Sequence, residues 1–212
     1  MPGLREHHRL EAMVGPLGFW SELQRYQIHL LRANGLQPEH TLLDIGCGPL
    51  QGGVAFIKYL KPNGYTGIDL DPARIQAAQI QIARHNLAEK RPSVLVSSTF
   101  GKAELGNQTF DFLWASQILC YFNNDVMACL FSTVRQQLNS GGKLLADVFA
   151  LDHYEFRYPE HSGQYFRHTQ QSLQTLAKKH GLRVRNLGMI ERFGYPKRLS
   201  LRTNLLFEFT PE

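Results

Sequence analysis

LLDIGCGPLQGG, residues 42–53, is the stretch of the sequence that decides the fold. Its first four residues have strand character, and they lead directly into a turn that is rich in glycine. Gly46 and Gly48 permit a sharp turn and let backbone N–H groups come close to a bound molecule. Gly52 and Gly53 begin a helix, and the positively polarised N-terminus of a helix favours anionic groups. The stretch therefore predicts a ligand-binding turn between a strand and a helix.

Short apolar segments alternate with helical segments around and beyond this turn. We predict five buried, parallel strands at residues 41–45, 65–70, 93–98, 110–115 and 143–149. Between them we expect helices at 53–60, 72–87 and 125–138, the second capped by Asp71 before Pro72 and the third closed by the NSGG that follows it. This alternation indicates a doubly wound, mostly parallel α/β sheet whose ligands bind beyond the carboxyl ends of the strands.

Two further regions complete the predicted sheet and its cover. Residues 19–36, FWSELQRYQIHLLRANGL, have apolar side chains at helical spacing and end at an Asn-Gly pair, so this helix should pack on the edge or top of the sheet. After the fifth strand we expect a helix at 169–182 and two β-like runs at 183–190 and 204–211. With no helix between them, these two strands must pair antiparallel, which gives a sheet of seven strands.

Length and composition fit a single domain. The chain has 212 residues, of which 43% are hydrophobic, and this is enough for one core. We expect one domain over 1–212, made of an N-terminal helical cap at 1–40 and a core at 41–212, with 150–168 as a substrate lid. No stretch approaches the roughly 18 apolar residues of a membrane span, and the first ten residues are too charged for a signal peptide. A soluble, cytoplasmic protein that does not bind membranes is therefore expected.

The cysteines and the net charge give weaker indications. Cys47, Cys120 and Cys129 are odd in number and lack the paired spacing of a zinc or redox site, so we expect reduced thiols and no metal. Cys47 has no evident base beside it, which favours a packing residue over a nucleophile, and Cys120 and Cys129 are expected in the core. The formal charge of +5 is too small to indicate nucleic-acid binding by itself.

A second motif, YTGIDLDP at residues 65–72, specifies the kind of ligand. Asp69 follows Gly46 by 23 residues and ends a predicted strand, where a carboxylate can accept hydrogen bonds from both hydroxyls of a ribose. The two motifs therefore predict an adenosine-type cofactor. The G-x-G-x-x-G pattern of dinucleotide-binding proteins is not met, because Gln51 stands at its third glycine position. A nicotinamide dinucleotide is therefore disfavoured.

Together the two motifs resemble motifs I and II of the class I S-adenosylmethionine-dependent methyltransferases, and the resemblance extends from residue 41 to 211. The antiparallel last strand matches the Rossmann-like fold of that family. Residues 19–60 and 165–184 are more narrowly similar to a group of bacterial methyltransferases, most of which have no assigned substrate. The resemblance implies S-adenosylmethionine as cofactor and methyl transfer as the activity.

The resemblance also implies a set of cofactor-binding residues. Asp44 would hold the amino group, directly or through water, and the turn that follows would face the methionine part. Asp69 would take the ribose, and the residue after it would flank the adenine. The full set implied is Asp44, Gly46, Cys47, Gly48, Asp69, Leu70, Thr99, Phe100, Ala115, Ser116 and Gln117. Relatives often carry an acid near Thr99, and its absence here implies that backbone groups make the adenine contacts.

The substrate side is expected in the segment at 151–168, which follows the fifth strand and concentrates aromatic residues and histidines. Segments this long without regular structure are usually lids or binding loops, although a surface loop pinned by aromatic plugs is an equal alternative. A hydroxyl acceptor, on a natural product or sugar, would benefit from a base. His153 is the first candidate because it comes soonest after the strand, with Tyr121 and Asp152 behind it.

Two other functions remain open on the sequence alone. Eight basic residues against one acid between 178 and 202 could follow the backbone of RNA, although Arg183 and Arg185 alternate as an exposed strand face would. A binding protein that has lost catalysis would also keep both motifs. Measuring methyl transfer to a broad panel of acceptors would distinguish such a non-catalytic scaffold from an enzyme. We favour a small-molecule acceptor over nucleic acid, and no pattern specifies an oligomeric state.

Overall fold

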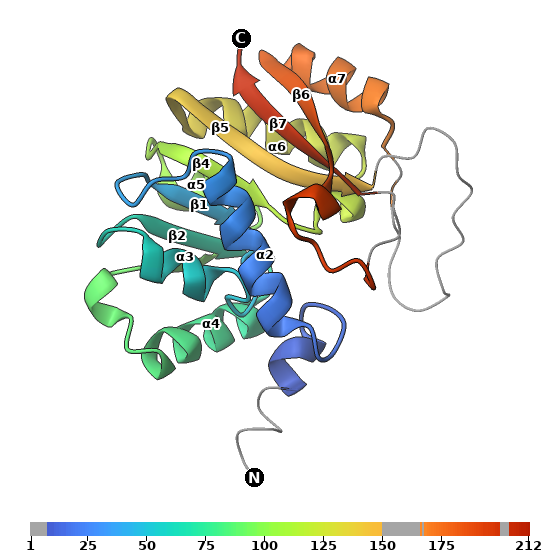
Figure 1. Cartoon of the computed structure of the whole chain (residues 1–212). Helices are drawn as coiled ribbons and strands as arrows, with labels where there is room; N and C mark the ends of the chain where they lie inside the picture. Colours follow the sequence, from blue (N-terminus) through green and yellow to red (C-terminus); the bar gives the residue numbers. More distant parts are fainter. Residues whose placement is uncertain (1–7, 150–165, 167, 200–203) are drawn as a thin grey trace.

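The computed structural model describes residues 8–149, 166, 168–199 and 204–212. In this part of the chain seven strands form one sheet with the order β3-β2-β1-β4-β5-β7-β6 (Figure 1). The strands are β1 Leu42–Ile45, β2 Tyr65–Asp69, β3 Ser93–Val96, β4 Phe110–Ala115, β5 Leu138–Phe149, β6 Leu182–Met189 and β7 Asn204–Pro211. Strands β1 to β5 are parallel, and β7 is antiparallel to both β5 and β6. The predicted doubly wound sheet with an antiparallel last strand is confirmed.

Helices cover both faces of this sheet (Figure 1). The α-helices are α2 Trp20–Ala33, α3 Gly53–Tyr59, α4 Pro72–Arg84, α5 Lys102–Leu105, α6 Asn124–Gln137 and α7 Gln170–Lys179. Three short 3₁₀ helices are η1 Ala88–Lys90, η2 Leu119–Tyr121 and η3 Ile190–Phe193, and residues 8–12 are also helical. Helices α2, α3 and α4 share one hydrophobic cluster, whereas α6 and α7 pack into another. No helix in the described ranges has both the length and the apolar character to cross a membrane.

The helix boundaries follow from local chemistry that the sequence displays. Asp71 caps α4, because its carboxylate accepts a hydrogen bond of 2.8 Å from the backbone N–H of Ala73 and Pro72 occupies the first helical position. The side chain of Asn123 caps α6 in the same way. Thr169 and Ser172 exchange side-chain and backbone hydrogen bonds at the start of α7. The predicted cap at Asp71 is confirmed.

Strand β1 occupies the centre of the parallel part of the sheet. All of its residues are buried between β2 and β4, with Asp44 level with Gly67 and Trp114. Because these strands are parallel, the residues that follow β1 and β4 emerge at the same edge of the sheet. This edge is where the glycine-rich turn begins.

Two expectations are wrong in detail. Strand β5 begins at Leu138 and not at residue 143, because Leu138 leaves α6 with an extended backbone (φ −84°, ψ 130°) and pairs with Phe110. The Asn-Ser-Gly-Gly segment therefore forms an irregular start of the strand, with a register shift between Phe110 and Phe112. Cys129 lies on the exposed side of α6 and not in the core, whereas Cys47 and Cys120 are buried as expected.

Candidate active site

A cavity of about 490 Å³ opens at the carboxyl ends of β1 and β4. Its floor is the glycine-rich turn after β1, together with Ser116 and Gln117 after β4. Its other walls come from residues 12–16, from the side of α2 that carries Tyr26, and from Tyr195 after η3. The volume is in the range of small-molecule sites in proteins.

The turn after β1 owes its shape to its glycines. Gly46 and Gly48 have φ angles of +73° and +53°, which other residues rarely adopt. A Cβ atom on Gly46 would lie 2.8 Å from the side chain of Ile118. The backbone N–H groups of Gly46 and Cys47 both donate to the carbonyl of Ile68, at 2.8 and 3.0 Å, so β2 fixes the position of the turn.

Helix α2 is held against this turn by polar contacts. The Gln27 Oε1 atom accepts a 3.0 Å hydrogen bond from the indole of Trp114, and Gln24 donates at 2.9 Å to the carbonyl of Gln51. A Cβ atom on Gly52 would lie 2.4 Å from Gln27 Oε1, so the close approach of α2 requires glycine there. Both Gln27 and Tyr26 line the cavity.

Residues 12–16 form a roof over the turn. The buried carboxylate of Glu11 accepts hydrogen bonds from the backbone N–H groups of Gly18 at 2.9 Å and Trp20 at 3.3 Å, which fixes the bend between the N-terminal helical residues and α2. Val14 packs so closely on Gly48 that a Cβ atom at Gly48 would lie 2.9 Å from Val14 Cγ1. This N-terminal segment thus contributes part of the cavity lining.

Asp69 joins the end of β2 to the glycine-rich turn. Its buried carboxylate accepts hydrogen bonds of 2.9 Å from the N–H groups of Gly48 and Asp71. Arg74 Nη1 lies 3.9 Å from Asp69 Oδ2 and also lines the cavity. Each carboxylate oxygen can accept a further hydrogen bond, so Asp69 keeps the capacity to bind a ligand.

Asp44 lies under the turn with a neutral partner. The Tyr65 hydroxyl donates a 2.7 Å hydrogen bond to Asp44 Oδ2. Gly53 and Gly67 leave room for this hydroxyl, because a Cβ atom on Gly53 would lie 2.6 Å from the Tyr65 oxygen and one on Gly67 would lie 2.9 Å from it. Burial raises the pKa of Asp44 to about 7, and the hydrogen bond from Tyr65 opposes this shift. Asp44 is therefore a buried acid that faces the cavity without a cationic partner among the described residues.

The other side of the cavity holds a second buried acid. Gln117 has a φ of +57°, and Asp147 on β5 stabilises this unusual conformation. The Gln117 backbone N–H donates to Asp147 Oδ1 at 2.7 Å, and its side-chain amide donates to Oδ2. Burial raises the pKa of Asp147 to about 6, a shift that these hydrogen bonds oppose.

Two tyrosines and a cysteine of the cavity lining are influenced by the charge of this acid. The rings of Tyr26 and Tyr195 meet edge to face, with centroids 5.1 Å apart. The hydroxyl of Tyr26 is buried and has no hydrogen-bond partner among the described residues. Burial is the main cause that raises the pKa values of these three groups, and the charge of Asp147 is the second. The pKa rises to about 12 for Tyr195 and Cys120, and well above its ordinary value for Tyr26. These three groups therefore stay protonated at neutral pH. Burial also raises the pKa of the Cys47 thiol. None of the four has the properties of an activated nucleophile.

The structure brings about half of the sequence-predicted residues to the cavity. Those that line it are Asp44, Gly46, Cys47, Ser116, Gln117 and Tyr121. The structure does not place the other described members of the set among the lining residues; these are Gly48, Asp69, Leu70, Thr99, Phe100 and Ala115. Leu70 is 69% exposed, and the Thr99 hydroxyl donates to Glu104. His153 and Asp152 fall outside the described residues, as does nearly all of the predicted lid, so their roles stay predictions.

Sequence reasoning missed several residues of the cavity and its support. They are Gln27, Tyr65, Arg74, Asp147 and Tyr195. Asp147 had a usable signal, because it is the only acid in the apolar strand segment KLLADVF. Tyr26 was recognised only as part of the buried helical face, since periodicity does not say which cavity that face borders.

Comparison with known proteins shows which proteins share this domain and fold. Residues 43–144 match the family model of a methyltransferase domain. The sterol 24-C-methyltransferase of Saccharomyces cerevisiae is 24% identical over 144 residues, which are 68% of this chain, and the chain spans 36% of that relative's length.

Solved structures share the fold at low sequence identity. A magnesium protoporphyrin IX methyltransferase from Synechocystis, with bound S-adenosylmethionine, has a TM-score of 0.67 and 15% identity over 99% of this chain and 91% of its own. An S-adenosylmethionine-dependent methyltransferase from Clostridium acetobutylicum has a TM-score of 0.69 and 13% identity, with 100% and 99% of the two chains covered. A mitomycin 7-O-methyltransferase has a TM-score of 0.66 and 18% identity, with 92% and 55% covered.

Residues 43–144 therefore match a methyltransferase domain, and the chain has the fold of the S-adenosylmethionine-dependent methyltransferases. The Synechocystis structures hold S-adenosylmethionine or S-adenosylhomocysteine, and a methyltransferase domain implies S-adenosylmethionine as the cofactor. The described residues fit this molecule, which carries a positive charge on its amino group and another on its sulfur. The cavity has a backbone wall at Gly46 and Gly52, and two buried acids lie at its sides, whereas Arg74 is the only basic residue among its described lining residues.

Proposed function

We propose that the protein is an active enzyme that transfers the methyl group of S-adenosylmethionine to a small-molecule acceptor, and that the acceptor atom is a hydroxyl oxygen. The observation that carries the proposal is the tyrosine-lined cavity beside the glycine-rich turn. Residues 12–16 and α2 form walls of this cavity close to the turn, which suits a molecule that enters whole better than a polymer that must pass through. The names of the sterol, porphyrin and mitomycin methyltransferases support the same class of acceptor.

Within this proposal each part of the site has a role toward the cofactor. Asp44 accepts a hydrogen bond from the amino group, and the backbone of Gly46, Cys47 and Gly48 faces the methionine part. Asp69 accepts from the ribose hydroxyls. Ala115, Ser116 and Gln117 border the methionine part from β4. The adenine lies against Leu70, Thr99 and Phe100, which follow β2 and β3.

The cofactor supplies a methyl group that its sulfonium already makes electrophilic, so the protein mainly orients the acceptor and excludes water. The residues of the roof and the rings of Tyr26 and Tyr195 restrict water on this side. A hydroxyl acceptor must also lose its proton, for which His153 is the first candidate and Asp152 another. Tyr121 lines the cavity and is positioned to contact an acceptor.

Tyr65→Phe should weaken S-adenosylmethionine binding and shift its pH dependence. Asp44 binds the amino group as an anion, so affinity should fall as the pH drops through about 7, its pKa. Loss of the Tyr65 hydrogen bond removes a contact that lowers this pKa, so the fall should begin at higher pH in the variant. Tyr65 and Cys47, whose pKa values burial raises, remain neutral in this range. Calorimetric titrations over a pH series test this, and an unchanged profile would contradict the role of Tyr65.

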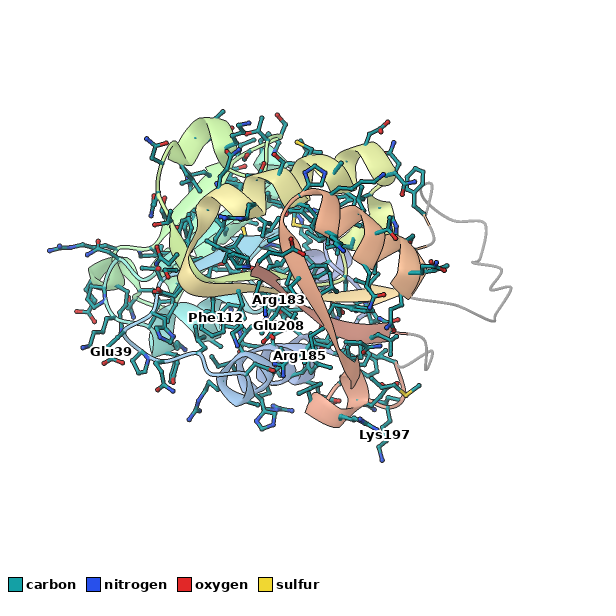
Figure 2. The ribbon with its side chains drawn as sticks, turned by 90° about the horizontal axis from the view of Figure 1, so that it is seen from above. Glu39, Phe112, Arg183, Arg185, Lys197 and Glu208 are labelled. Atoms are coloured by element: carbon teal, nitrogen blue, oxygen red, sulfur yellow. The ribbon has the colours of Figure 1, made fainter. Side chains whose placement is uncertain are left out.

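A nucleic-acid acceptor is less well supported, because two of the basic side chains of the C-terminal segment, Arg183 and Arg185, lie away from the cavity. Arg183 and Arg185 line a second hollow of about 980 Å³, formed by the first residues of β5 and β6 and the end of β7. This is the opposite edge of the sheet from the turn after β1. Figure 2 shows both arginines beside Glu208, with which Arg185 forms a 2.9 Å ion pair. Arg198 is also engaged, since it pairs with Glu22 and lies over the ring of Phe19.

Reversing the charge of Arg183 and Lys197, both exposed, should therefore leave S-adenosylmethionine affinity within about twofold of the wild type, because exposed charges are screened over about 10 Å at ordinary salt. Calorimetry measures this affinity. Fluorescence anisotropy with a labelled RNA hairpin provides the opposing test. Tight RNA binding with a steep salt dependence that disappears in the double variant would favour RNA as the acceptor.

The proposed activity is tested by incubating the protein with S-adenosylmethionine labelled in its methyl group and a panel of phenols, alcohols, sugars, amines, thiols and RNA. Transfer to a small hydroxyl compound is expected. Transfer to RNA alone would support the nucleic-acid alternative. Cofactor binding without transfer to any acceptor of a broad panel would support a non-catalytic scaffold.

A further inference from the structure

The hollow of about 980 Å³ at the amino ends of β5 and β6 has a chemistry of its own. Its described lining residues include three arginines, which are Arg135 from α6 and Arg183 and Arg185 from β6. None of its described lining residues also lines the cavity at the carboxyl ends of β1 and β4. Its volume is in the range of small-molecule sites. The hollow is therefore separate from the proposed site of methyl transfer.

Strand pairing places the two arginines of β6 on one face of the sheet. Arg183 is level with Thr210 of β7, and Arg185 is level with Glu208. Side chains two residues apart on a strand point to the same face, so these four residues share it. Figure 2 shows Arg183 and Arg185 beside Glu208. Both arginines are thus presented by hydrogen-bonded strands and not by a loop.

Glu208 is already neutralised by its neighbours. Its Oε1 atom accepts a 3.0 Å hydrogen bond from Arg185 Nε and lies 2.9 Å from Arg185 Nη2. Its Oε2 atom lies 2.9 Å from Lys143 Nζ, and the whole residue is 7% exposed. Two positive charges therefore meet one negative charge. The pair fixes the guanidinium of Arg185, and the N–H groups of its Nη1 atom remain available to a ligand.

The other two arginines form no ion pair with an acid of the described chain. Arg183 donates a 3.3 Å hydrogen bond to the carbonyl of Pro211, and its side chain is otherwise exposed. Arg135 extends over Gly181, where a Cβ atom would lie 3.7 Å from Arg135 Nε. Each guanidinium has five N–H donors, so most of the donors on these two side chains are left for a bound molecule.

The first residues of β5 give the hollow a fixed wall. A Cβ atom on Gly142 would lie 2.9 Å from the carbonyl oxygen of Phe110 and 3.0 Å from that of Asn139, so glycine is required there. The Asn139 side chain donates a 2.8 Å hydrogen bond to Asp111 of β4. Strand β4 therefore holds this wall in place.

We propose that this hollow is a second binding site, which takes a small molecule through its phosphate or diphosphate group. A guanidinium presents paired N–H donors that match the oxygens of a phosphate, and three guanidiniums line this one hollow. The acids Glu208 and Glu212 also line it and interrupt the positive surface. This interruption favours a compact phosphate over the long backbone of RNA, which is bound along a continuous basic stripe.

The experiment is a calorimetric titration of the full chain with inorganic pyrophosphate at low ionic strength. Binding at one site per chain is expected, and it should weaken as sodium chloride is added, because exposed charges are screened. Arg135→Gln and Arg183→Gln should each lower the affinity about fivefold, and the double variant about 25-fold, since each change removes one charged donor group.

Lys197→Gln is the matched control. Lys197 is exposed and lies apart from the two labelled arginines and Glu208 (Figure 2). Its replacement removes one positive charge elsewhere and should leave the pyrophosphate affinity within about twofold of the wild type. Glu212→Gln removes an acid from the lining, and should instead strengthen pyrophosphate binding by about twofold.

A titration of the Arg135→Gln, Arg183→Gln double variant with S-adenosylmethionine separates this proposal from the proposed function. Neither arginine lines the cavity beside the glycine-rich turn, so the cofactor affinity should stay within about twofold of the wild type. This result also shows that the variant is folded. Failure of the wild type to bind S-adenosylmethionine would contradict the proposed function and leave the pyrophosphate result to be judged by itself.

Three results would overturn the proposal of a phosphate site. The first is no binding of pyrophosphate by the wild type at millimolar concentration. The second is an equal loss of affinity in Lys197→Gln and in the arginine variants, or no loss in the double variant, because either would indicate general attraction to a basic protein. The third is tighter binding of an RNA hairpin than of pyrophosphate, lost in the double variant, which would assign the arginines to RNA.

Discussion

Replacing Asp69 by alanine should lower the affinity for S-adenosylmethionine by about 10-fold to 100-fold, the loss expected when hydrogen bonds to a charged group are removed. Two effects combine in this variant. The ribose loses its carboxylate acceptor, and the N–H of Gly48 loses the oxygen that holds it at 2.9 Å. The glycine-rich turn should therefore be less well ordered for binding. Calorimetric titration of the purified variant measures the effect.

Asp71→Ala is the control for this experiment. Asp71 is two residues away, and its structural role is to cap α4. Its loss should lower the free energy of unfolding by about 1 kcal/mol, the usual effect of removing an N-cap, and change the affinity only slightly. If Asp69→Ala binds as well as Asp71→Ala and the wild type, Asp69 is not a ligand of the cofactor.

The second large effect is expected at His153. If the acceptor is a hydroxyl, His153→Ala should lower turnover by about 100-fold to 10,000-fold, because a general base acts in the transition state. Affinity for S-adenosylmethionine should change by no more than a few-fold. The measurement is the rate of methyl transfer to the hydroxyl compound that the acceptor panel identifies, beside a titration with the cofactor.

His85→Ala serves as the control, because His85 is exposed at the end of α4 and distant in sequence from the predicted lid. Full turnover in His153→Ala would exclude His153 as the base. Tyr121→Phe and Asp152→Asn would then be the next variants to compare, and full turnover in these as well would indicate transfer without a protein base.

The sequence was sufficient to predict the central part of the fold because its signals there are local. The turn after β1 needs glycines with positive φ, Asp71 and Pro72 begin α4 by their own chemistry, and parallel strands with crossover helices follow from alternation. The antiparallel pairing of β6 and β7 also followed from the missing helix between them. The start of β5 differed by five residues, since a Gly-Gly pair in a strand looks like a turn when its partner strand is unknown.

The second half of the site could not be predicted because it is assembled by packing between distant residues. Trp114 and Gln27 are 87 positions apart, and Asp147 and Gln117 are 30 apart, so no spacing rule connects either pair. Tyr26 could be assigned to a buried helical face, but its position beside Tyr195 depends on how α2 docks against η3. The niche for the Tyr65 hydroxyl exists only where Gly53 and Gly67 meet.

The most direct test of the cofactor site is a pair of calorimetric titrations of the wild-type protein, one with S-adenosylmethionine and one with NAD. Binding of S-adenosylmethionine at one site per chain, with no measurable response to NAD, is the predicted result. Binding of NAD at micromolar affinity, with no response to S-adenosylmethionine, would contradict it.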